Sequence, residues 1–461
     1  MAKSAATKFA ILAVAGELAT VALIFRAMTS HSSFLAELAW RGMLYQQTDG
    51  AAVALAAGPV TGYCGFDPTA PSLHVGNLVP VMGLVHLQRA GHRPMVLVGG
   101  GTGMIGDPSG RTTERPLANE AVVATNSAAI RRQLEHFLDF SGPSAALMRN
   151  NADWLKPLGA IAFLRDVGKH FSINLMLAKD SVRSRLDEGI TYTEFSYMLL
   201  QAYDFLELSR QEGVTLQIGG SDQWGNITAG TELIRRATGS EAHGVTMPLL
   251  TNADGRKFGK SEGGNVWLAP ERTSPYRFYQ FWINSDDRDV GRNLRFFTLL
   301  PQAEIEQLEL ASRERPEARL AQQTLALDVT ARVHGERAAR LARDVSRLVF
   351  DRHADPRELH VDALHAIEAE VPVVDVPPVN VPDTVTAAVD IVDGLVLLGM
   401  AKSKGDARRQ LHQGAVSVNG RRLSATETAV ASEEAIHSRY FLVRKGGREI
   451  GLLRLPAAAV R

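Results

Sequence analysis

The chain has 461 residues, of which 45% are hydrophobic and 22% are charged, and this length suits a soluble protein of two or three domains. Its 50 Lys and Arg residues balance 50 Asp and Glu residues, which excludes a polycationic nucleic-acid binder, so any contact with nucleic acid must come from local patches. The one cysteine, Cys64, excludes an intrachain disulfide and a thiolate metal cluster.

Residues 1–27 differ in composition from the rest of the chain. Lys3 and Lys8 precede the apolar stretch FAILAVAGELATVALIF, as in a signal peptide, but Glu17 interrupts this stretch and it is short for a membrane span. Met28 then opens MTSHSSFLAELAWRG, which predicts an amphipathic helix. We interpret residues 1–27 as a dispensable extension from a misplaced start codon, with a targeting peptide as the alternative.

Residues 58–240 alternate between β-rich runs and helical patterns, which predicts a parallel α/β domain. The runs VTGYCGF and PMVLVGG flank LHVGNLVPVMGLVHLQRAGH, a helical pattern with Ser72 as the expected N-cap and Gly91 as the stop. Together they form a βαβ unit. A further strand, VTLQIGG at 214–220, leads through SDQWGN into the helix ITAGTELIRRATG. In the apolar run VTGYC, Cys64 reads as a small buried hydrophobe rather than a catalytic nucleophile.

The loop before the first of these helices is a candidate anion site, because helix N-termini present unpaired N–H groups and a positive dipole end. His74 and Asn77 are three residues apart and would point to the same side with hydrogen-bond donors. These two residues alone are explained better by a helix cap at His74 than by a ligand contact.

Residues 101–106, GTGMIG, follow a strand and match the dinucleotide fingerprint G-x-G-x-x-G. This fingerprint must open a helix, whereas Asp107-Pro108-Ser109-Gly110 follows at once and its Pro and Gly prevent helix growth. No Gly-Lys-Ser/Thr ends the loop, so it is not a Walker A loop either. A nicotinamide-dependent dehydrogenase therefore stays only as a minor alternative.

The stretch FSYMLLQAYDFLEL (195–208) predicts a buried helix with a polar stripe, because Tyr197, Gln201 and Asp204 share one face of an otherwise apolar pattern. Buried polar groups need partners, so the stripe belongs either to an internal hydrogen-bond network or to the site of a small polar ligand.

The segment NADGRKFGKSEGGN (252–265) is rich in Gly and Lys, with Lys257 and Lys260 on either side of Phe258-Gly259. It is either a solvated loop or a lid that carries two ammonium groups to a polyphosphate.

The remainder of the chain divides into a helical region, a Pro-rich stretch and a basic unit. Residues 270–350 are helical in pattern, and EVPVVDVPPVNVPDTV (370–385) predicts a semi-rigid linker. Residues 400–450 carry a surplus of positive charge, which is suited to RNA phosphates.

Several of these strings together resemble one family. LHVGN resembles the HIGH motif and KFGKS the KMSKS motif of class I aminoacyl-tRNA synthetases, and Asn77 and Phe258-Gly259 are variants familiar among them. The strings YCGFDPTAPSLHVGN, LVGGGTGMIGDPSGR, TEFSYMLLQAYDFL and LQIGGSDQWGNITAG are similar to bacterial tyrosyl-tRNA synthetases in particular. The C-terminal KSKGDARRQLHQGAVSVNGRRL is similar to a small RNA-binding module shared with a ribosomal protein. The resemblance runs from about residue 33 to the C-terminus.

The resemblance implies a Rossmann-like parallel-sheet catalytic domain, then a helical domain and a small α+β RNA-binding domain. We place these at 28–265, 266–365 and 386–461, with the linker at 366–385. It also implies a cytoplasmic homodimer without membrane contact, and the segment 154–176 has enough exposed-looking apolar residues to form the interface.

The implied activity joins L-tyrosine to the 3′ end of tRNA(Tyr) through a tyrosyl-adenylate made from ATP. By the resemblance, tyrosine is held by Tyr63 and Asp204 at its phenol and by Asp107, Tyr197 and Gln201 at its ammonium group. The implied ATP-binding residues are Gly65, Asp67, His74, Gly220, Asp222, Gln223, Lys260 and Ser261. The implied catalytic residues are Thr69, His74, Asn77, Arg111, Arg115, Lys257 and Lys260.

We expect Mg²⁺ to enter the site bound to ATP, because no carboxylate cluster in the sequence looks like a dedicated metal site. A synthetase-like binding protein that has lost activation is the remaining alternative. The presence of His74, Asp204, Lys257 and Lys260 argues against that alternative.

Overall fold

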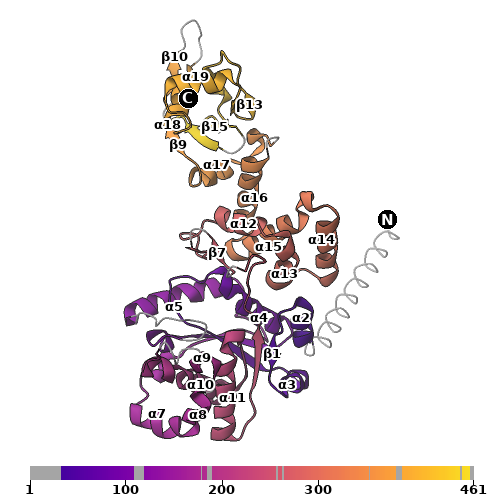
Figure 1. Cartoon of the computed structure of the whole chain (residues 1–461), viewed down its shortest axis with the longest axis vertical. Coiled ribbons are helices and arrows are strands. Elements are labelled where there is room, and N and C mark those ends of the chain that lie inside the picture. Colours follow the sequence, from indigo (N-terminus) through magenta and orange to yellow (C-terminus); the bar gives the residue numbers. More distant parts are fainter. Residues whose placement is uncertain are drawn as a thin grey trace, which may run out of the picture. The chain divides into compact units, whose positions relative to one another are not determined.

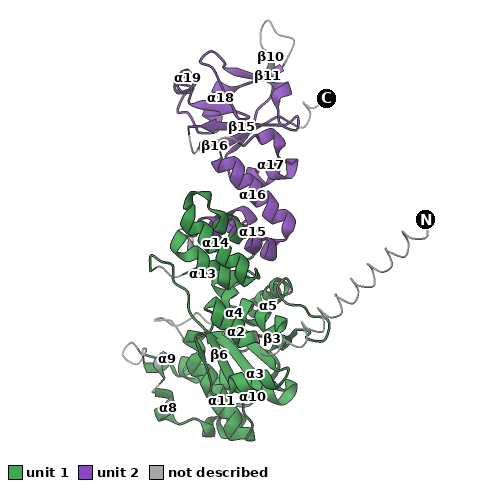
Figure 2. Cartoon of the chain, turned by 90° about the vertical axis from the view of Figure 1, so that its right-hand side faces the viewer, with its two compact units in different colours: residues 1–273, 285–325 green, residues 274–284, 326–461 purple. Residues whose placement is uncertain are grey.

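The computed structural model describes residues 33–107, 119–177, 179–183, 189–255, 258–261, 264–351, 354–380, 387–446 and 449–456 (Figure 1). Our interpretation of residues 1–27 lies outside this range. The chain forms two compact units, one made of residues up to 273 together with 285–325, and the other of 274–284 together with 326–461 (Figure 2). Among the described helices, none has the length and apolar character needed to cross a membrane.

The first unit is built on a six-stranded sheet with the order β1-β6-β5-β2-β3-β4. Its strands are β1 (Gln46–Gln47), β2 (Thr61–Phe66), β3 (Arg93–Val98), β4 (Leu147–Asn150), β5 (Val214–Gly220) and β6 (His243–Met247). All neighbours are parallel except β1, which runs antiparallel to β6. The chain moves outward from β2 to β4 and then returns to β5 on the other side of β2. This doubly wound order confirms the predicted Rossmann-like sheet.

Helices cover the sheet of the first unit or connect its strands. They are α2 (Ser33–Arg41), α3 (Ala51–Ala57), α4 (Leu78–Arg89), α5 (Glu120–Leu134), α6 (Ala152–Leu155), α7 (Ala160–Asp166), α8 (Ile173–Leu177), α9 (Asp180–Arg183), α10 (Tyr192–Glu212) and α11 (Trp224–Thr238). The helices α13 (Asp287–Phe297), α14 (Gln302–Glu314) and the start of α15 (Leu320–His334) follow the sheet in the chain and complete this unit. The βαβ unit β2-α4-β3 is confirmed.

Successive residues of β2 face opposite sides of the sheet, as in any strand. A Cβ on Gly62 would lie 2.8 Å from Leu87 of α4, so on this side the helix packs directly on the strand backbone. The next residue, Tyr63, instead packs edge-on against Phe205 of α10, with 5.2 Å between ring centroids. The ring of Tyr63 is thereby held in the apolar cluster under α10 and α11.

The start of α4 differs from the expectation, because Ser72 is not its N-cap. The short 3-10 turn η1 (Val75–Asn77) precedes the helix, and His74 caps this turn. His74 Nδ1 accepts a hydrogen bond from Gly76 N at 3.1 Å, and Asn77 Oδ1 accepts one from His74 N at 3.0 Å. This reciprocal capping box places the capping residue two positions after Ser72, and α4 itself begins only at Leu78. The expected stop at Gly91 is confirmed, with a φ of 88° after the helix ends at Arg89.

The glycine-rich loop after β3 forms only the short turn η2 (Thr102–Met104), so no α-helix opens there. Its glycines allow close packing of side chains. A Cβ on Gly99 would lie 2.1 Å from Asp67 Oδ1, and one on Gly100 would lie 2.2 Å from Asn150 Oδ1. The match to the dinucleotide fingerprint is therefore a coincidence of composition.

The second unit combines helices with two small sheets, of order β10-β11-β14 and β13-β12-β15-β16-β9. Its elements are α12 (Pro275–Ile283), the rest of α15, α16 (Glu336–Phe350), α17 (Val361–Glu368), β9 (Val373–Asp375), β10 (Val379–Asn380), β11 (Ala387–Asp390), α18 (Ile391–Leu397), α19 (Lys404–His412), β12 (Val416–Val418), β13 (Arg421–Arg422), β14 (Ala429–Ala431), β15 (Tyr440–Lys445) and β16 (Glu449–Arg454). This is the predicted α+β character of the C-terminal region.

The Pro-rich stretch expected to be a linker is partly built into a sheet. β9 pairs in parallel with β16, with Leu452 opposite Val373 and Arg454 opposite Asp375. Arg454 also donates to the carboxylate of Asp375 through Nε at 2.6 Å. The strand β9 is therefore fixed to the C-terminal end of the chain, while residues 381–386 lie outside the described range. The domain boundaries proposed from the sequence stay predictions.

Candidate active site

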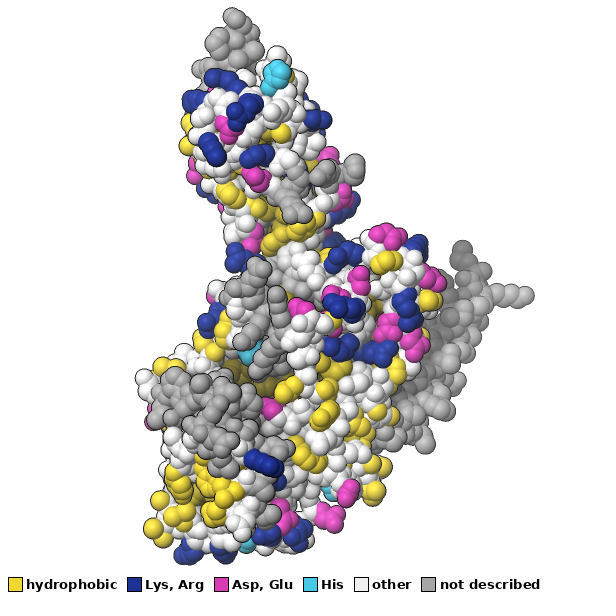
Figure 3. Space-filling model, viewed as in Figure 1, with side chains coloured by type: hydrophobic (Ala, Val, Ile, Leu, Met, Phe, Trp, Pro, Cys, Tyr) yellow, Lys and Arg dark blue, Asp and Glu magenta, His cyan; other side chains and the backbone are white. Residues whose placement is uncertain are grey.

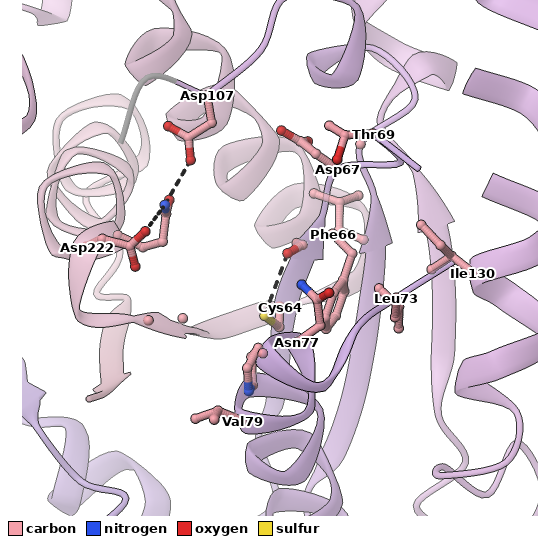
Figure 4. A pocket seen from close by; sticks show the side chains of 18 of the residues that line it. Cys64, Phe66, Asp67, Thr69, Leu73, Asn77, Val79, Asp107, Ile130 and Asp222 are labelled. Atoms are coloured by element: carbon pink, nitrogen blue, oxygen red, sulfur yellow. Dashed lines mark hydrogen bonds between the residues drawn. The ribbon is translucent and has the colours of Figure 1, made fainter. Parts of the chain in front are cut away.

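A cavity of about 720 Å³ opens at the carboxyl ends of β2 and β5, where the strand order of the sheet reverses (Figure 4). In open α/β sheets, ligands bind at this switch point. Most of the residues singled out from the sequence line it together. They are Tyr63, Gly65, Asp67, Thr69, His74, Asn77, Asp107, Tyr197, Gln201, Asp204, Gly220, Asp222 and Gln223.

Five of the expected residues are not placed in this way. Arg111, Arg115 and Lys257 lie outside the described residues. The backbone of Lys260 and Ser261 forms β7 (Lys260–Ser261), which pairs with β8 (Gly264–Asn265), but their side chains are not described.

The inner end of the cavity holds two buried polar side chains, Tyr63 and Asp204. Asp204 Oδ1 accepts a hydrogen bond from Trp154 Nε1 at 2.7 Å, and Oδ2 accepts one from Asn151 Nδ2 at 2.8 Å. The Tyr63 hydroxyl is fully enclosed and has no hydrogen-bond partner in the described structure. A buried acceptor beside a buried hydroxyl without a partner suits a ligand that carries a hydroxyl group of its own.

Burial dominates the electrostatics of this pair. It raises the pKa of Asp204 to about 8, against the opposing effect of the hydrogen bonds from Asn151 and Trp154. Burial and then the charge of Asp204 hold the pKa of the Tyr63 phenol well above 10.0. Tyr63 therefore stays a neutral hydroxyl at any physiological pH, whereas Asp204 can gain or lose its proton near neutrality.

Sequence reasoning missed Asn151 and Trp154, the two partners of Asp204. They follow β4, and Asn151 also accepts from Gly101 N at 2.7 Å and donates to Thr102 Oγ1 at 2.9 Å. The only signal was their position: polar and aromatic residues directly after a strand, at the edge of the sheet where the cavity lies.

The middle of the cavity contains a linked set of carboxylates and amides. Tyr197 Oη donates to Asp67 Oδ2 at 3.0 Å. On the other side, Gln223 Nε2 donates to Asp107 Oδ2 at 2.8 Å (Figure 4), and Gln201 Nε2 donates to Gln223 Oε1 at 3.3 Å. The polar stripe of α10 thus forms an internal hydrogen-bond network, which confirms the first interpretation, and it also lines the cavity, where its role in binding a ligand stays a prediction.

The outer end of the cavity brings the LHVGN and KFGKS segments together. Val75 N donates to Val266 O at 2.9 Å, and Val266 N donates to Gly259 O at 3.0 Å, so one residue links the two segments. A Cβ on Gly259 would lie 2.7 Å from Val75 Cγ2, and its φ is 83°. Phe258 stacks on Phe297 of α13 with 5.3 Å between centroids. The described part of KFGKS is therefore packed against η1 and α13.

Cys64 also lines the cavity, but it is 3% exposed, and burial raises the pKa of its thiol to about 12. A thiol with this pKa stays protonated and is a poor nucleophile. The interpretation of Cys64 as a small buried hydrophobe is confirmed.

The segment expected to form the homodimer interface exposes apolar side chains. Within the segment 154–176, Ile161, Leu164 and Ile173 are exposed, and Figure 3 shows apolar side chains gathered near α7 at the lower left.

In the C-terminal unit several basic residues are paired with acids, whereas Lys402 and Arg408 are exposed and have no ion pair among the described residues. No cluster of three or more His, Cys, Asp or Glu suited to a metal ion occurs in the part of the chain that the structure describes.

Comparisons with known proteins agree over nearly the whole chain. The family model for class I tRNA synthetases (W and Y) matches residues 55–351, and the model for the SYY-like C-terminal domain of tyrosine–tRNA ligase matches residues 368–453. The chain is 51% identical to the tyrosine–tRNA ligase of Anaeromyxobacter dehalogenans over 423 residues, which cover 92% of this chain and 99% of that protein. It is 51% identical over 424 residues to the tyrosine–tRNA ligase of Geobacillus stearothermophilus, with 91% of this chain and 99% of that protein covered.

Solved structures show the same similarity. The crystal structure of a C-terminally truncated mitochondrial tyrosyl-tRNA synthetase from Aspergillus nidulans matches with a TM-score of 0.63 and 29% sequence identity. The match covers 69% of this chain and 94% of that one.

Proposed function

We propose that this chain, which belongs to the class I tRNA synthetases of the tryptophan and tyrosine type, is a tyrosine–tRNA ligase. The observation that carries this proposal is the buried pair at the inner end of the cavity. A phenol hydroxyl can donate to Asp204 and accept from Tyr63 at once, whereas an indole N–H can only donate and would leave the Tyr63 hydroxyl without a partner. The pair therefore favours tyrosine over tryptophan and over phenylalanine, which has no hydroxyl.

The first reaction follows from the class I family, which uses ATP. The tyrosine carboxylate attacks the α-phosphorus of ATP and expels pyrophosphate, so an acyl–phosphate bond forms as the α–β phosphoanhydride bond breaks. Negative charge develops on the leaving pyrophosphate, and catalysis consists of positioning and charge stabilisation without a covalent enzyme intermediate. We propose Lys257, Lys260, Arg111 and Arg115 as the cations that stabilise this charge.

His74 and Asn77 are proposed to serve the phosphates from the outer end. Because His74 Nδ1 accepts from Gly76 N, the neutral imidazole carries its proton on Nε2, which can donate to a phosphate oxygen. Asn77 Oδ1 is used by the backbone of His74, so its Nδ2 group can be the donor. Thr69 is exposed at the same end. The helix cap and the ligand contact at His74 are therefore compatible.

The remaining assignments extend the same proposal. The ammonium group of tyrosine lies against Asp107, Tyr197 and Gln201. The ribose and phosphates of ATP lie along Gly65, Asp67, Gly220, Asp222, Gln223 and Ser261, and Mg²⁺ arrives with ATP. The adenylate then passes its tyrosyl group to the 3′-terminal ribose of tRNA(Tyr), with the C-terminal unit contacting the RNA, and the exposed apolar residues near α7 belong to a homodimer interface.

The test is tyrosine-dependent exchange of labelled pyrophosphate into ATP, measured without tRNA and beside phenylalanine and tryptophan. Exchange with tyrosine alone supports both the adenylate chemistry and the phenol pocket. No exchange with any amino acid would refute the proposed activity. The dehydrogenase alternative is wrong, because no helix opens at residues 101–106 and the chain belongs to a ligase family.

A further inference from the structure

The segment between β2 and η1, residues 67–74, carries Asp67, Thr69 and His74 into the cavity, and its only regular structure is an isolated antiparallel bridge between His74 and Trp267. Within it Thr69 N donates to Asp67 O at 2.8 Å. A backbone segment that lacks the regular hydrogen bonds of a helix or sheet keeps its conformation only if other groups bind its N–H and C=O groups. The positions of three proposed ATP contacts therefore depend on what binds this segment from outside.

Two side-chain amides of α5 hold it. Asn126, which is buried, donates from Nδ2 to Pro68 O at 2.9 Å. Two helical turns later, Gln133 uses both ends of its amide: Oε1 accepts from Leu73 N at 2.8 Å, and Nε2 donates to Ser72 Oγ at 2.9 Å. A spacing of seven residues places both amides on the same face of α5.

The contact at Gln133 continues into the segment that leads from KFGKS. Ser72 Oγ, itself buried, accepts from Ala269 N at 3.1 Å and donates to Leu73 O at 2.6 Å. Leu268 N donates to Leu73 O at 2.9 Å. The amide of Gln133 therefore fixes the backbone directly before His74 and joins it to residues 268–269.

The apolar side of α5 completes the support. Ile130, between the two amides, is 1% exposed and lines the cavity on the same side as Leu73 and Thr69 (Figure 4). The helix thus forms part of the cavity wall and also holds the irregular segment by hydrogen bonds.

We propose that Gln133 and Asn126 are positioning residues for ATP, an inference that rests on the proposed function. They hold residues 68–73 so that Thr69 and His74 are aligned before ATP binds, and ATP binding does not have to order the segment. Recognition of the tyrosine phenol does not depend on them, because Tyr63 lies on β2 and Asp204 on α10, and neither amide bonds to these elements.

The central experiment measures pyrophosphate exchange and tyrosine binding for Gln133→Met, which keeps the side-chain length and removes both hydrogen bonds. We expect kcat/KM for ATP to fall about tenfold, the equivalent of roughly one net hydrogen bond. The tyrosine Kd should stay within about twofold of its original value, within the usual scatter of distant substitutions.

Gln88 provides a matched control. It is also a half-buried glutamine that uses both ends of its amide, donating to Asp139 O at 2.7 Å and to Ser144 O at 2.9 Å and accepting from Asp139 N at 3.0 Å. It does not line the cavity. Gln88→Met therefore loses comparable bonds, and we expect unchanged ATP kinetics.

Two further variants separate positioning from general stability. Gln133→Glu keeps the acceptor for Leu73 N, and the Ser72 hydroxyl can turn to donate to it, so most of the ATP kinetics should return. Should Gln133→Met not fold, Ser72→Ala removes the same contact from the other side and should lower kcat/KM for ATP with unchanged tyrosine affinity.

The outcomes are distinct. If the Gln133 and Gln88 variants have the same ATP kinetics, or if Ser72→Ala behaves as the unchanged protein, the positioning role is refuted while the proposed ligase activity stands. Absence of tyrosine-dependent exchange in the unchanged protein would instead refute the proposed function itself.

Discussion

Replacing Asp204 by Asn tests the phenol-recognition pair with the smallest change in shape. The carboxylate now accepts from both Trp154 Nε1 and Asn151 Nδ2, and it has lone pairs left for the substrate hydroxyl. An asparagine offers one oxygen and one NH₂ group, so one of the two neighbouring donors would face another donor. The substitution also removes the negative charge that strengthens the bond to the phenol.

The conflict between donors affects the stability of the protein, whereas the loss of charge affects the binding of tyrosine. The conflict between donors is present with and without ligand, so it lowers the free energy of unfolding, by about 1–3 kcal/mol for one buried unsatisfied donor. The loss of a hydrogen bond to a charged acceptor, about 1.5–3 kcal/mol, acts on binding and raises the tyrosine Kd by roughly 10- to 100-fold.

The pH dependence of tyrosine binding tests independently whether the negative charge of Asp204 strengthens the affinity. Since burial raises the pKa of Asp204 to about 8, the carboxyl of the free protein is mostly protonated at pH 7. If tyrosine binds the ionised form, its affinity rises with pH up to about 8 and is constant above it, by at most about tenfold per pH unit. The affinity of Asp204→Asn should show no such rise.

The assay is equilibrium dialysis of labelled tyrosine against both proteins from pH 6 to 9, with thermal unfolding in parallel. A Kd for Asp204→Asn within about twofold of the original at pH 8.5, where the charge is present, would refute the reasoning. So would the same pH profile in both proteins.

The other predictions concern the hydroxyl, the outer loop and the RNA contact. Tyr63→Phe removes a buried hydroxyl that has no partner, so the unfolding free energy should rise by about 1 kcal/mol while the preference for tyrosine over phenylalanine in pyrophosphate exchange falls about tenfold; a lower melting temperature with unchanged preference would contradict this. Gly259→Ala, whose Cβ would lie 2.7 Å from η1, should slow exchange several-fold at unchanged tyrosine Kd. Gly255→Ala has a similar φ of 80° and open space around it, so equal slowing there would assign the effect to backbone strain alone. Lys402→Glu with Arg408→Glu should weaken tRNA charging, most at low salt, and leave exchange intact; equal charging at all salt concentrations would exclude these residues from the RNA contact.

Local patterns were enough for the elements that form the floor of the cavity. The strand at 214–220 was predicted with the bounds that β5 has, and the helix after it was predicted too, although α11 begins at Trp224, three residues before its expected start. Hydrophobic alternation, glycines and helical periodicity are properties of neighbouring residues, so they can be read without knowledge of the fold. The same holds for the polar stripe of α10, whose residues face one side because of helical spacing alone.

The partners of Asp204 could not be predicted in this way. Asn151 and Trp154 are about 50 residues away in the chain. They reach Asp204 because β4 pairs with β3 and ends at the same edge of the sheet as β2. Strand order is a non-local property, so the residues that complete the pocket from β4 appear only once the sheet is assembled.

The Pro-rich stretch shows the same limit and changes how the RNA contact should be tested. Its composition is that of a linker, but β9 within it pairs with β16, about 80 residues later. Nothing in the residues next to β9 in the sequence indicates this pairing. One apolar cluster contains Val345 and Leu348 of α16 together with Tyr440, Leu442 and Leu452 of the last two strands. A cut at residue 385 would therefore expose this core as well as remove basic residues, and a loss of charging could come from either cause. Charge reversal at exposed positions of α19 and the residues before it leaves the core whole, so it isolates the electrostatic contribution that the sequence predicted.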